Sequence, residues 1–203
     1  MKDIKNIIFD LGGVILNIDT RKTAMALEQL GVSNLQGHMS QPALVSFFNE
    51  YEAGKIDDNA FVAKLQSLAA EGTTEQNIVD AWNALLLDFP AERIELLRSL
   101  RKKYRLFLLS NTNAIHYNKF QQQIYLQTGN YLEDFFEQTY YSHTMRLRKP
   151  DVACYQFVIQ ESKLNPAETI FLDDSEINLA GAREAGLIIE HIHAGRSILD
   201  IKW

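Results

Sequence analysis

The sequence is poor in cysteine and contains no long apolar run. Among its 203 residues there is a single cysteine, Cys154. One cysteine excludes a disulfide framework within the chain and a zinc site built on cysteines, and it is typical of a reducing compartment such as the cytoplasm. We therefore expect Cys154 to be a buried thiol in a cytoplasmic protein whose core is large enough to fold without a covalent staple.

Basic residues are also scarce. Lysine and arginine number 20 against 26 aspartates and glutamates, which gives a net charge of −6. Proteins that bind nucleic acid hold its phosphates with clustered Lys and Arg, so this balance argues against a nucleic-acid partner. No apolar run approaches the ~20 residues of a membrane span, and the N-terminal run reaches an acid too early for a signal peptide. The expected partner is a small molecule.

Short apolar runs recur along the chain, and most end in polar residues. They cover residues 4–9, 106–109, 169–172 and 187–189, with a weaker candidate at 136–141. Continuous apolar runs of this length are typical of parallel strands buried on both faces. Helical patterns at 91–103, 150–163 and 175–184 alternate with these runs. The alternation predicts an α/β fold, a Rossmann-like parallel sheet flanked by helices.

The stretch 17–88 interrupts this alternation. It contains no strand-like run, and apolar residues such as Phe61, Leu65 and Leu68 fall at helical spacing, which predicts about four short helices. Because the strands resume at residue 106, these helices are expected to be an insertion. The predicted organisation is a core of residues 1–16 and 89–203 with a small α-helical cap of residues 17–88.

Polar residues stand at the ends of three predicted strands. They are Asp10, Ser110, Asn111, Asp173 and Asp174. In a parallel α/β sheet, ligands bind outside the carboxyl ends of the strands, so these side chains should meet at one edge. Lys149, at the entry of the helix before the third of these strands, should join them. Carboxylates suit a hard cation, and a lysine with hydroxyl and amide donors suits phosphate oxygens.

The order and spacing of these segments resemble the four motifs of the haloacid dehalogenase-like (HAD) hydrolase superfamily. The segments are residues 9–14, 109–113, 148–151 and 171–178. A helical insertion between the first two is similar to the branch of this family with a helical (C1) cap. Within that branch, Phe-Asp-Leu-Gly-Gly-Val-Ile and Ser-Asn-Thr-Asn resemble bacterial sugar-phosphate phosphatases of the glucose-1-phosphate type.

This resemblance implies a Mg²⁺-dependent phosphatase for a small phosphorylated metabolite, with a sugar phosphate as the expected substrate. Asp10 would be the nucleophile and form an aspartyl-phosphate, which splits one difficult displacement into two easier ones. Lys149 would neutralise the charge on Asp10 and on the transferring phosphoryl group. Ser110, Asn111 and Lys149 would bind the phosphate. An ordinary turn at Ser110 and Asn111 is the structural alternative.

The resemblance also implies the metal ligands. Mg²⁺ would be held by Asp10, by the main-chain carbonyl of Gly12 and by Asp174, with Asp173 assisting directly or through water. Adjacent acids repel one another, and a cation is their natural neutraliser. Capping of the following helix is an alternative role for Asp173 and Asp174 that is compatible with metal binding. Asn178 occupies a position that is often acidic in the family, and we expect it to support the site from behind.

One position departs from the family pattern. Most phosphatases of this family carry a second Asp two residues after the nucleophile, where this chain has Gly12. Acid–base help of this kind is typically worth ~10²–10⁴ in rate. Either the leaving group needs less help, as an anomeric sugar oxygen would, or another acid such as Asp19 serves, or the protein is a slow or non-catalytic phosphate-binding relative. The branch that the chain resembles also has Gly here, which favours the first interpretation.

The cap should contact the leaving group of the substrate and determine which leaving groups are accepted. The candidates are Asn17, Arg21, Phe47, Glu50, Tyr51, Lys55 and Trp82. Of these, Phe47 and Trp82 are equally typical of a helix core. We expect His116, just after the second motif, to lie on the surface of a helix. His191 and His193 have no carboxylate or cysteine at ligand spacing, so no function is expected of them.

Overall fold

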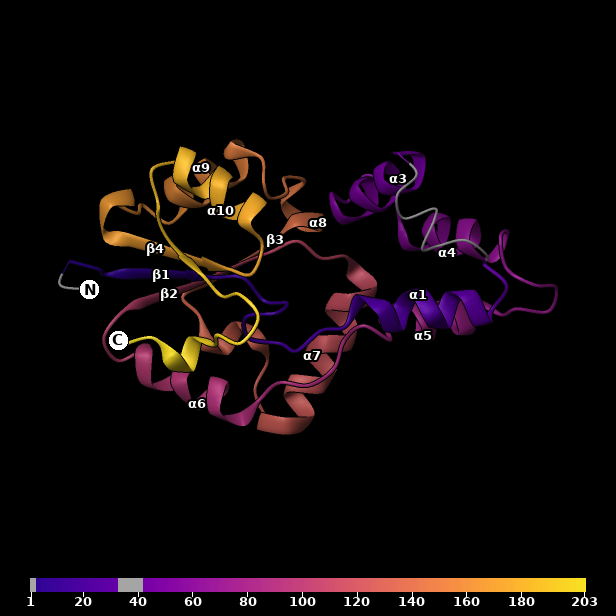
Figure 1. Ribbon diagram of the computed structural model, residues 1–203, viewed down its shortest axis with the longest axis horizontal. Helices are drawn as coiled ribbons and strands as arrows, with labels where there is room; N and C mark the ends of the chain where they lie inside the picture. The colour runs from indigo at the N-terminus through magenta and orange to yellow at the C-terminus, as the bar shows by residue number, and fades with distance from the viewer. Residues whose placement is uncertain (1–2, 33–41) are drawn as a thin grey trace.

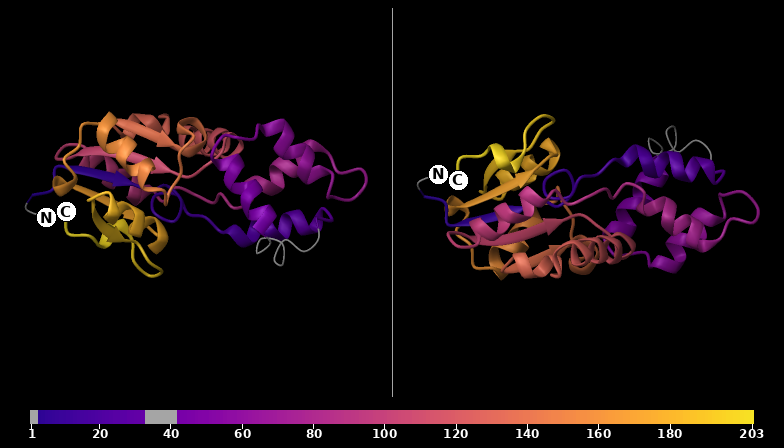
Figure 2. Two further views of the ribbon diagram at one scale, coloured as in Figure 1. Left: turned by 90° about the horizontal axis from the view of Figure 1, so that it is seen from above. Right: turned by 90° about the horizontal axis from the view of Figure 1, so that it is seen from below.

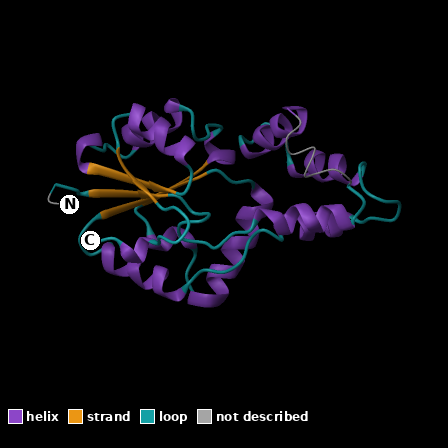
Figure 3. Ribbon diagram, viewed as in Figure 1, coloured by secondary structure: helices purple, strands orange, loops and turns teal. Residues whose placement is uncertain are grey.

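Five parallel strands form one sheet at the centre of the protein. The computed structural model describes residues 3–32 and 42–203. The strands are β1 (Asn6–Phe9), β2 (Arg105–Ser110), β3 (Gln138–Tyr141), β4 (Thr169–Asp173) and β5 (Ile188–His191), in the order β3-β2-β1-β4-β5. All neighbours pair in parallel, and helices surround the sheet (Figure 3). The predicted α/β class is confirmed, and the weak candidate at 136–141 is a strand at the sheet edge.

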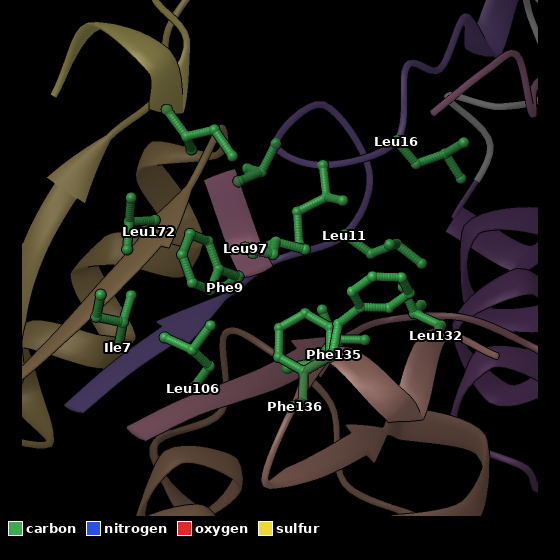
Figure 4. Close-up of a cluster of buried hydrophobic side chains, with 14 of the residues drawn as sticks. Ile7, Phe9, Leu11, Leu16, Leu97, Leu106, Leu132, Phe135, Phe136 and Leu172 are labelled. Carbon is green, nitrogen blue, oxygen red and sulfur yellow. The ribbon is translucent and has the colours of Figure 1, made fainter. Parts of the chain in front are cut away.

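Both faces of the sheet are covered, which explains the continuous apolar runs. Ile7 and Phe9 belong to an apolar cluster with residues of α6 (Ala91–Leu100) and α7 (Ala114–Thr128), whereas Ile8 belongs to a cluster with residues of α9 (Val152–Glu161) and α10 (Glu176–Glu184). Figure 4 shows the first cluster, where Phe9 lies among side chains from the neighbouring strands and from Leu97. Alternate residues of a strand point to opposite faces, so a strand buried on both sides needs apolar residues at every position.

The helices of this α/β part lie on opposite sides of the sheet, α9 and α10 on one side and α6 and α7 on the other (Figure 1). They are α6 (Ala91–Leu100), α7 (Ala114–Thr128), α8 (Ser142–Met145), α9 (Val152–Glu161) and α10 (Glu176–Glu184), with the short 3-10 helices η1 (Leu132–Phe135), η2 (Pro166–Glu168) and η3 (Ile198–Asp200). A helix was expected at His116, but the apolar pattern gave it no bounds; it spans Ala114–Thr128. Glutamines interrupt the apolar spacing there, and α7 buries a face that is partly polar, including Gln121.

The described helices between β1 and α6 are α1 (Thr20–Gln29), α3 (Pro42–Glu52), α4 (Asp58–Gln66) and α5 (Glu75–Asn83). We call these four helices the helical insertion. They lie beyond the carboxyl ends of the strands, apart from the sheet, in all three views (Figures 1 and 2). They share an apolar cluster that includes Leu27, Phe61, Leu65 and Trp82, and α7 contributes Ile115 to it.

Two chain segments join the helical insertion to the sheet, and they run side by side. The Asn17 N–H donates to the Asp88 carbonyl over 2.9 Å, the Leu87 N–H to Asn17 over 3.0 Å, and the Asp19 N–H to Leu85 over 2.9 Å. This antiparallel pairing satisfies main-chain groups of both connections between the helical insertion and the sheet. These hydrogen bonds therefore link the two connections to each other.

Candidate active site

The sheet register brings the polar strand ends together. Phe9 pairs with Leu108 on one side and with Leu172 on the other, so β1, β2 and β4 end at the same level. Asp10 follows directly on the first of these strands, and Ser110 and Asp173 are the last residues of the other two. Asp10 and Asp173, which are 163 residues apart in the sequence, therefore lie at the same edge of the sheet, and this edge faces the helical insertion.

Lys149 lies at the centre of this edge. Its Nζ donates to Asp10 Oδ1 and to Asp173 Oδ2, each over 2.6 Å. The lysine side chain is 1% exposed and that of Asp173 is 0% exposed, while Asp10 is also buried. Burying a charge is costly unless it is paired, so a lysine this deep requires carboxylate partners at hydrogen-bond distance.

Burial is the main cause of the raised pKa values of Asp10 and Asp174, and repulsion among the carboxylates adds to it. Burial raises the pKa of Asp10 above its usual range, the Lys149 ammonium opposes that rise, and the nearby Asp173 and Asp174 charges add to it. Burial alone lowers the pKa of Lys149, but its attraction to Asp10 and Asp173 outweighs that effect and raises it. Burial, followed by repulsion from Asp173, raises the pKa of Asp174. Three carboxylates thus share one cation.

The three carboxylates can converge on a metal ion. Asp10, Asp173 and Asp174 each offer an oxygen atom, and these atoms lie within 4.8 Å of one another. An all-oxygen, carboxylate donor set suits a hard divalent cation such as Mg²⁺, which would also supply the missing positive charge. Asp174 is the exposed member of the three, so it can reach an ion that enters from solvent.

Gly13 makes room for this cluster, and the sequence analysis had not singled it out. Its φ is +74°, a conformation that favours glycine, and a β-carbon at this position would lie 2.4 Å from Asp174 Oδ2. Both the backbone conformation and the space beside the carboxylate therefore require glycine. The only sequence signal was the pair of glycines that follows the predicted nucleophile.

Asp173 is held in place on every side. Its Oδ1 accepts from the Ser175 N–H over 2.8 Å and from Asn178 Nδ2 over 3.0 Å, and its Oδ2 accepts from Asn178 Nδ2 over 3.1 Å as well as from Lys149. Asn178 supports the site from behind, as expected. This arrangement makes Asp173 the group that aims Lys149 at Asp10.

The Asn111 side chain is directed to Lys149. Its Nδ2 donates to the Lys149 carbonyl and its Oδ1 accepts from the Lys149 N–H, both over 2.9 Å. These two hydrogen bonds use both polar atoms of the Asn111 side chain, which was expected to bind phosphate. They also fix the main chain of Lys149, whose ammonium is buried. The neighbouring Ser110 hydroxyl is buried, and within residues 3–32 and 42–203 its one hydrogen-bond partner is the Asn111 carbonyl, at a long 3.4 Å.

Neither Gly12 nor Asp19 offers a proton donor in this conformation. A β-carbon at Gly12 would lie 3.0 Å from Ile18 Cδ1, the flexible end of an apolar side chain. Asp19 caps α1 and pairs with Arg21, whose Nε and Nη2 donate to its two oxygens over 2.9 Å each. These hydrogen bonds lower the pKa of Asp19, which favours its ionised form over the acid that a leaving alcohol needs.

Most of the residues expected to contact the leaving group pack against, or form hydrogen bonds with, other residues of the protein. Trp82 and Tyr51 are buried in the helical insertion, and the half-buried Phe47 ring stacks on Phe61 at 5.4 Å. The interpretation of Phe47 and Trp82 as core residues therefore fits, and Tyr51 joins them, with its hydroxyl bonded to Asp58 over 2.7 Å. The remaining candidates lie in the connecting segment or on the exposed surface: Asn17, Arg21, Glu50 and Lys55.

The expectation that His116 lies on the surface is wrong. Its side chain is buried between α7 and the end of α5, and both ring nitrogens are hydrogen-bonded. The error arose because α7 packs on the helical insertion, a contact that no local pattern reveals. His191 contacts the Asp174 carbonyl through Nε2 at 3.1 Å, whereas His193 is exposed, lies edge-on to the His191 ring and contacts the adjacent Ala194 carbonyl.

A buried lysine between strand-end carboxylates, on a parallel sheet with a helical insertion after the first strand, defines a class of hydrolase. This chain belongs to the haloacid dehalogenase-like hydrolase family, whose model matches residues 4–186. The family and the hydrolase class inferred from the sequence are confirmed. Within the described residues, no helix is both long and apolar enough to cross a membrane.

Several characterised proteins are similar to this chain. It is 31% identical over 183 residues to a D-ribitol-5-phosphate phosphatase of Bacteroides thetaiotaomicron, covering 90% of this chain and 89% of that protein. A HAD family enzyme of the same organism superposes with a TM-score of 0.91 at 33% identity, covering 98% of this chain and 99% of the other. A structure of a HAD family enzyme from that organism in complex with magnesium and inorganic phosphate gives a TM-score of 0.88 at 33% identity, covering 96% and 97%.

Proposed function

We propose that this enzyme hydrolyses a small phosphate monoester through an aspartyl-phosphate on Asp10. The observation that carries the proposal is the position of Lys149, whose ammonium lies 2.6 Å from both Asp10 and Asp173. Similarity to a D-ribitol-5-phosphate phosphatase supports the phosphatase activity. Mg²⁺ is the cofactor, a conclusion supported by the carboxylate cluster and by the relative in complex with magnesium and phosphate.

In the first step, an Asp10 carboxylate oxygen attacks phosphorus and the bond to the leaving oxygen breaks. Lys149 lowers the repulsion between the anionic nucleophile and the phosphoryl group, and it stabilises charge on the equatorial oxygens. The Ser110 hydroxyl can orient these oxygens. The carboxylates of Asp10 and Asp174 and the Gly12 carbonyl would hold Mg²⁺, which would supply further positive charge for the phosphoryl group.

In the second step, water attacks the aspartyl-phosphate, which releases inorganic phosphate and restores the Asp10 carboxylate. The leaving oxygen must gain one proton in the first step, and the attacking water must lose one in the second. Gly12 cannot supply either transfer, and Arg21 holds Asp19 in its ionised form. We propose that the proton is exchanged with solvent, at a cost in rate that depends on how basic the leaving oxygen is.

The substrate that we propose is a phosphorylated sugar or polyol. A D-ribitol-5-phosphate phosphatase among the relatives supports a small hydroxylated leaving group. We also propose that residues 17–88 act as a cap over a core of residues 1–16 and 89–203, with the paired connections at Asn17 and Asp88 as its hinge. The cytoplasmic location remains a prediction.

A second candidate function is phosphate binding without turnover. The observation that favours it is the lack of a suitable proton donor at Gly12 and at Asp19. An aryl phosphate separates the two possibilities, because a phenolate leaves without protonation and is therefore insensitive to a missing acid. Turnover of an aryl phosphate with binding but no turnover of alkyl phosphates would point to the missing acid alone.

The test is phosphate release from an aryl phosphate, from anomeric sugar phosphates and from polyol phosphates, with Mg²⁺ and with chelator. The native chain, Asp10→Asn and the matched exposed control Asp3→Asn are compared. We expect release that requires Mg²⁺, disappears in Asp10→Asn and persists in Asp3→Asn. Release that survives in Asp10→Asn would refute the nucleophile. Bound phosphate without release from any ester would favour the second candidate function.

A further inference from the structure

A stack of aromatic rings crosses from the helical insertion to α7. The Trp82 indole, at the end of α5, lies 5.0 Å from the His116 imidazole with an angle of 10° between the planes. The same indole stacks with Phe48 of α3 at 5.3 Å and meets Phe61 of α4 edge-on at 4.7 Å. His116 is therefore one of the points at which the aromatic core of the helical insertion touches the α/β part of the chain.

The hydrogen bonds of His116 determine which of its ring nitrogens carries the proton. Asn113 caps α7, and its Oδ1 accepts from the His116 main-chain N–H over 3.0 Å, so its Nδ2 must be the group that faces His116 Nδ1 at 3.0 Å. Nδ1 is then an acceptor. Nε2 lies 3.0 Å from the Trp82 carbonyl, which can only accept, so Nε2 carries the proton. Both nitrogens of a neutral imidazole are satisfied.

The Trp82 carbonyl is shared by the two parts of the chain. It accepts from His116 on α7 and also from the Thr23 hydroxyl on α1 over 2.9 Å. The same hydroxyl accepts from the Leu85 N–H over 3.0 Å, in the segment that leads back to the sheet. A displacement of α5 would therefore pull on α7 and on the connecting segment together.

We call the contacts of His116 with Trp82 and Asn113 the joint. On the Asn113 side, the joint reaches the proposed phosphate loop, which we define as residues 110–113. Asn113 closes the loop, and within it Asn111 holds the main chain of Lys149. A second contact joins the loop to the helical insertion, because Ser142 Oγ accepts from the Thr112 N–H over 2.9 Å and donates to the Glu52 carbonyl over 2.6 Å. The loop is thus held by α5 at one point and by the end of α3 at another.

We propose that His116 is a positioning residue that fixes the phosphate loop according to where the helical insertion sits. The inference rests on the proposed function, since it assigns phosphate binding to this loop. His116 acts through Asn113 and Trp82 and touches no reacting atom. When the helical insertion packs on α7, the joint holds residues 110–113, and with them Lys149, in the geometry needed for phosphoryl transfer. Without the joint, the loop loses that geometry.

Trp82 gives a direct readout of the joint. The sequence has two tryptophans, Trp82 and Trp203, so Trp203→Phe leaves Trp82 as the only indole emitter. We expect Mg²⁺ with inorganic phosphate to shift the Trp82 emission of this protein. His116→Gln in the same background should abolish the shift, and the matched exposed control His193→Gln should retain it. An undiminished shift in His116→Gln, with phosphate bound as before, would overturn the proposal.

Kinetics provide the second measurement. A misplaced catalytic loop typically costs about 10- to 100-fold in rate, so we expect His116→Gln to lower kcat by that factor with a smaller change in KM, and His193→Gln to stay within about twofold. If His116→Gln does not fold by circular dichroism, Asn113→Ser, which can still cap α7 but cannot donate to His116 Nδ1, should give the same loss. His116→Phe keeps the ring and removes both bonds, so native activity in this variant would overturn the proposal.

The two hypotheses fail in different ways. If the Trp203→Phe protein binds neither Mg²⁺ nor phosphate by calorimetry and releases no phosphate from an aryl ester, the proposed function itself fails. If it binds and turns over, but His116→Gln and Asn113→Ser match it in emission and in kcat, only the positioning role of His116 fails.

Discussion

Replacing Lys149 with methionine should destabilise the fold as well as stop catalysis. The lysine is 1% exposed and bonds two carboxylates at 2.6 Å, one of which, on Asp173, is 0% exposed. Methionine fills a similar volume but leaves both acids without their cation. Removing one partner from a buried ion pair typically costs about 3–5 kcal/mol. Because this lysine serves two acids, we expect the free energy of unfolding to fall by an amount in the upper part of that range.

The assay is urea unfolding followed by circular dichroism at pH 8 with chelator present, so that no divalent ion replaces the lost charge. The exposed control Lys103→Met should change the unfolding free energy by no more than about 0.5 kcal/mol. The double variant Lys149→Met with Asp173→Asn should be more stable than Lys149→Met alone, because one uncompensated charge has been removed. A loss below about 1 kcal/mol for Lys149→Met, or a double variant less stable than the single one, would refute this reasoning.

Two further predictions concern Gly13 and His116. Gly13→Ala should lower activity about 100-fold and raise the Mg²⁺ concentration needed, because its β-carbon would fall 2.4 Å from Asp174 Oδ2; Gly72→Ala, with φ +85° but nothing within 4 Å, should keep native Mg²⁺ dependence in the same titration. Burial lowers the pKa of His116 to about 4, against about 6.5 in an unfolded chain. Between these values only the unfolded chain takes up the proton, so stability should fall by up to about 3 kcal/mol as pH drops from 6.5 to 4. Urea midpoints should show a smaller fall in His116→Gln.

Much of the active-site composition was predictable from the sequence. Asp10, Ser110 and Asp173 each follow or end an apolar run, and parallel strands in one sheet must end on the same edge. A strand direction and a fold class therefore bring these residues together without knowledge of any side-chain contact. The predicted helical stretch between the first two strands was likewise readable, because its apolar residues repeat at helical spacing and no strand-like run interrupts them.

The sequence could not indicate what each polar group bonds to. Asn111 was assigned to phosphate from its place in a motif, but only the three-dimensional position of the Lys149 main chain directs its amide there. Asp19 was a candidate acid by proximity in sequence, and the adjacent Arg21 removes that option through two hydrogen bonds that depend on side-chain conformation.

The burial of His116 is another feature that the sequence could not indicate. Along the chain it is one polar residue in a glutamine-rich stretch, and its surroundings give no sign of burial. Only the packing of α7 on α5 gives it the Trp82 carbonyl and ring as partners. Local periodicity therefore determined which segments become strands and where their polar ends meet. The contacts between elements distant in sequence decided which groups are buried, paired and charged, because burial and hydrogen bonding depend on neighbours that the chain acquires only when it folds.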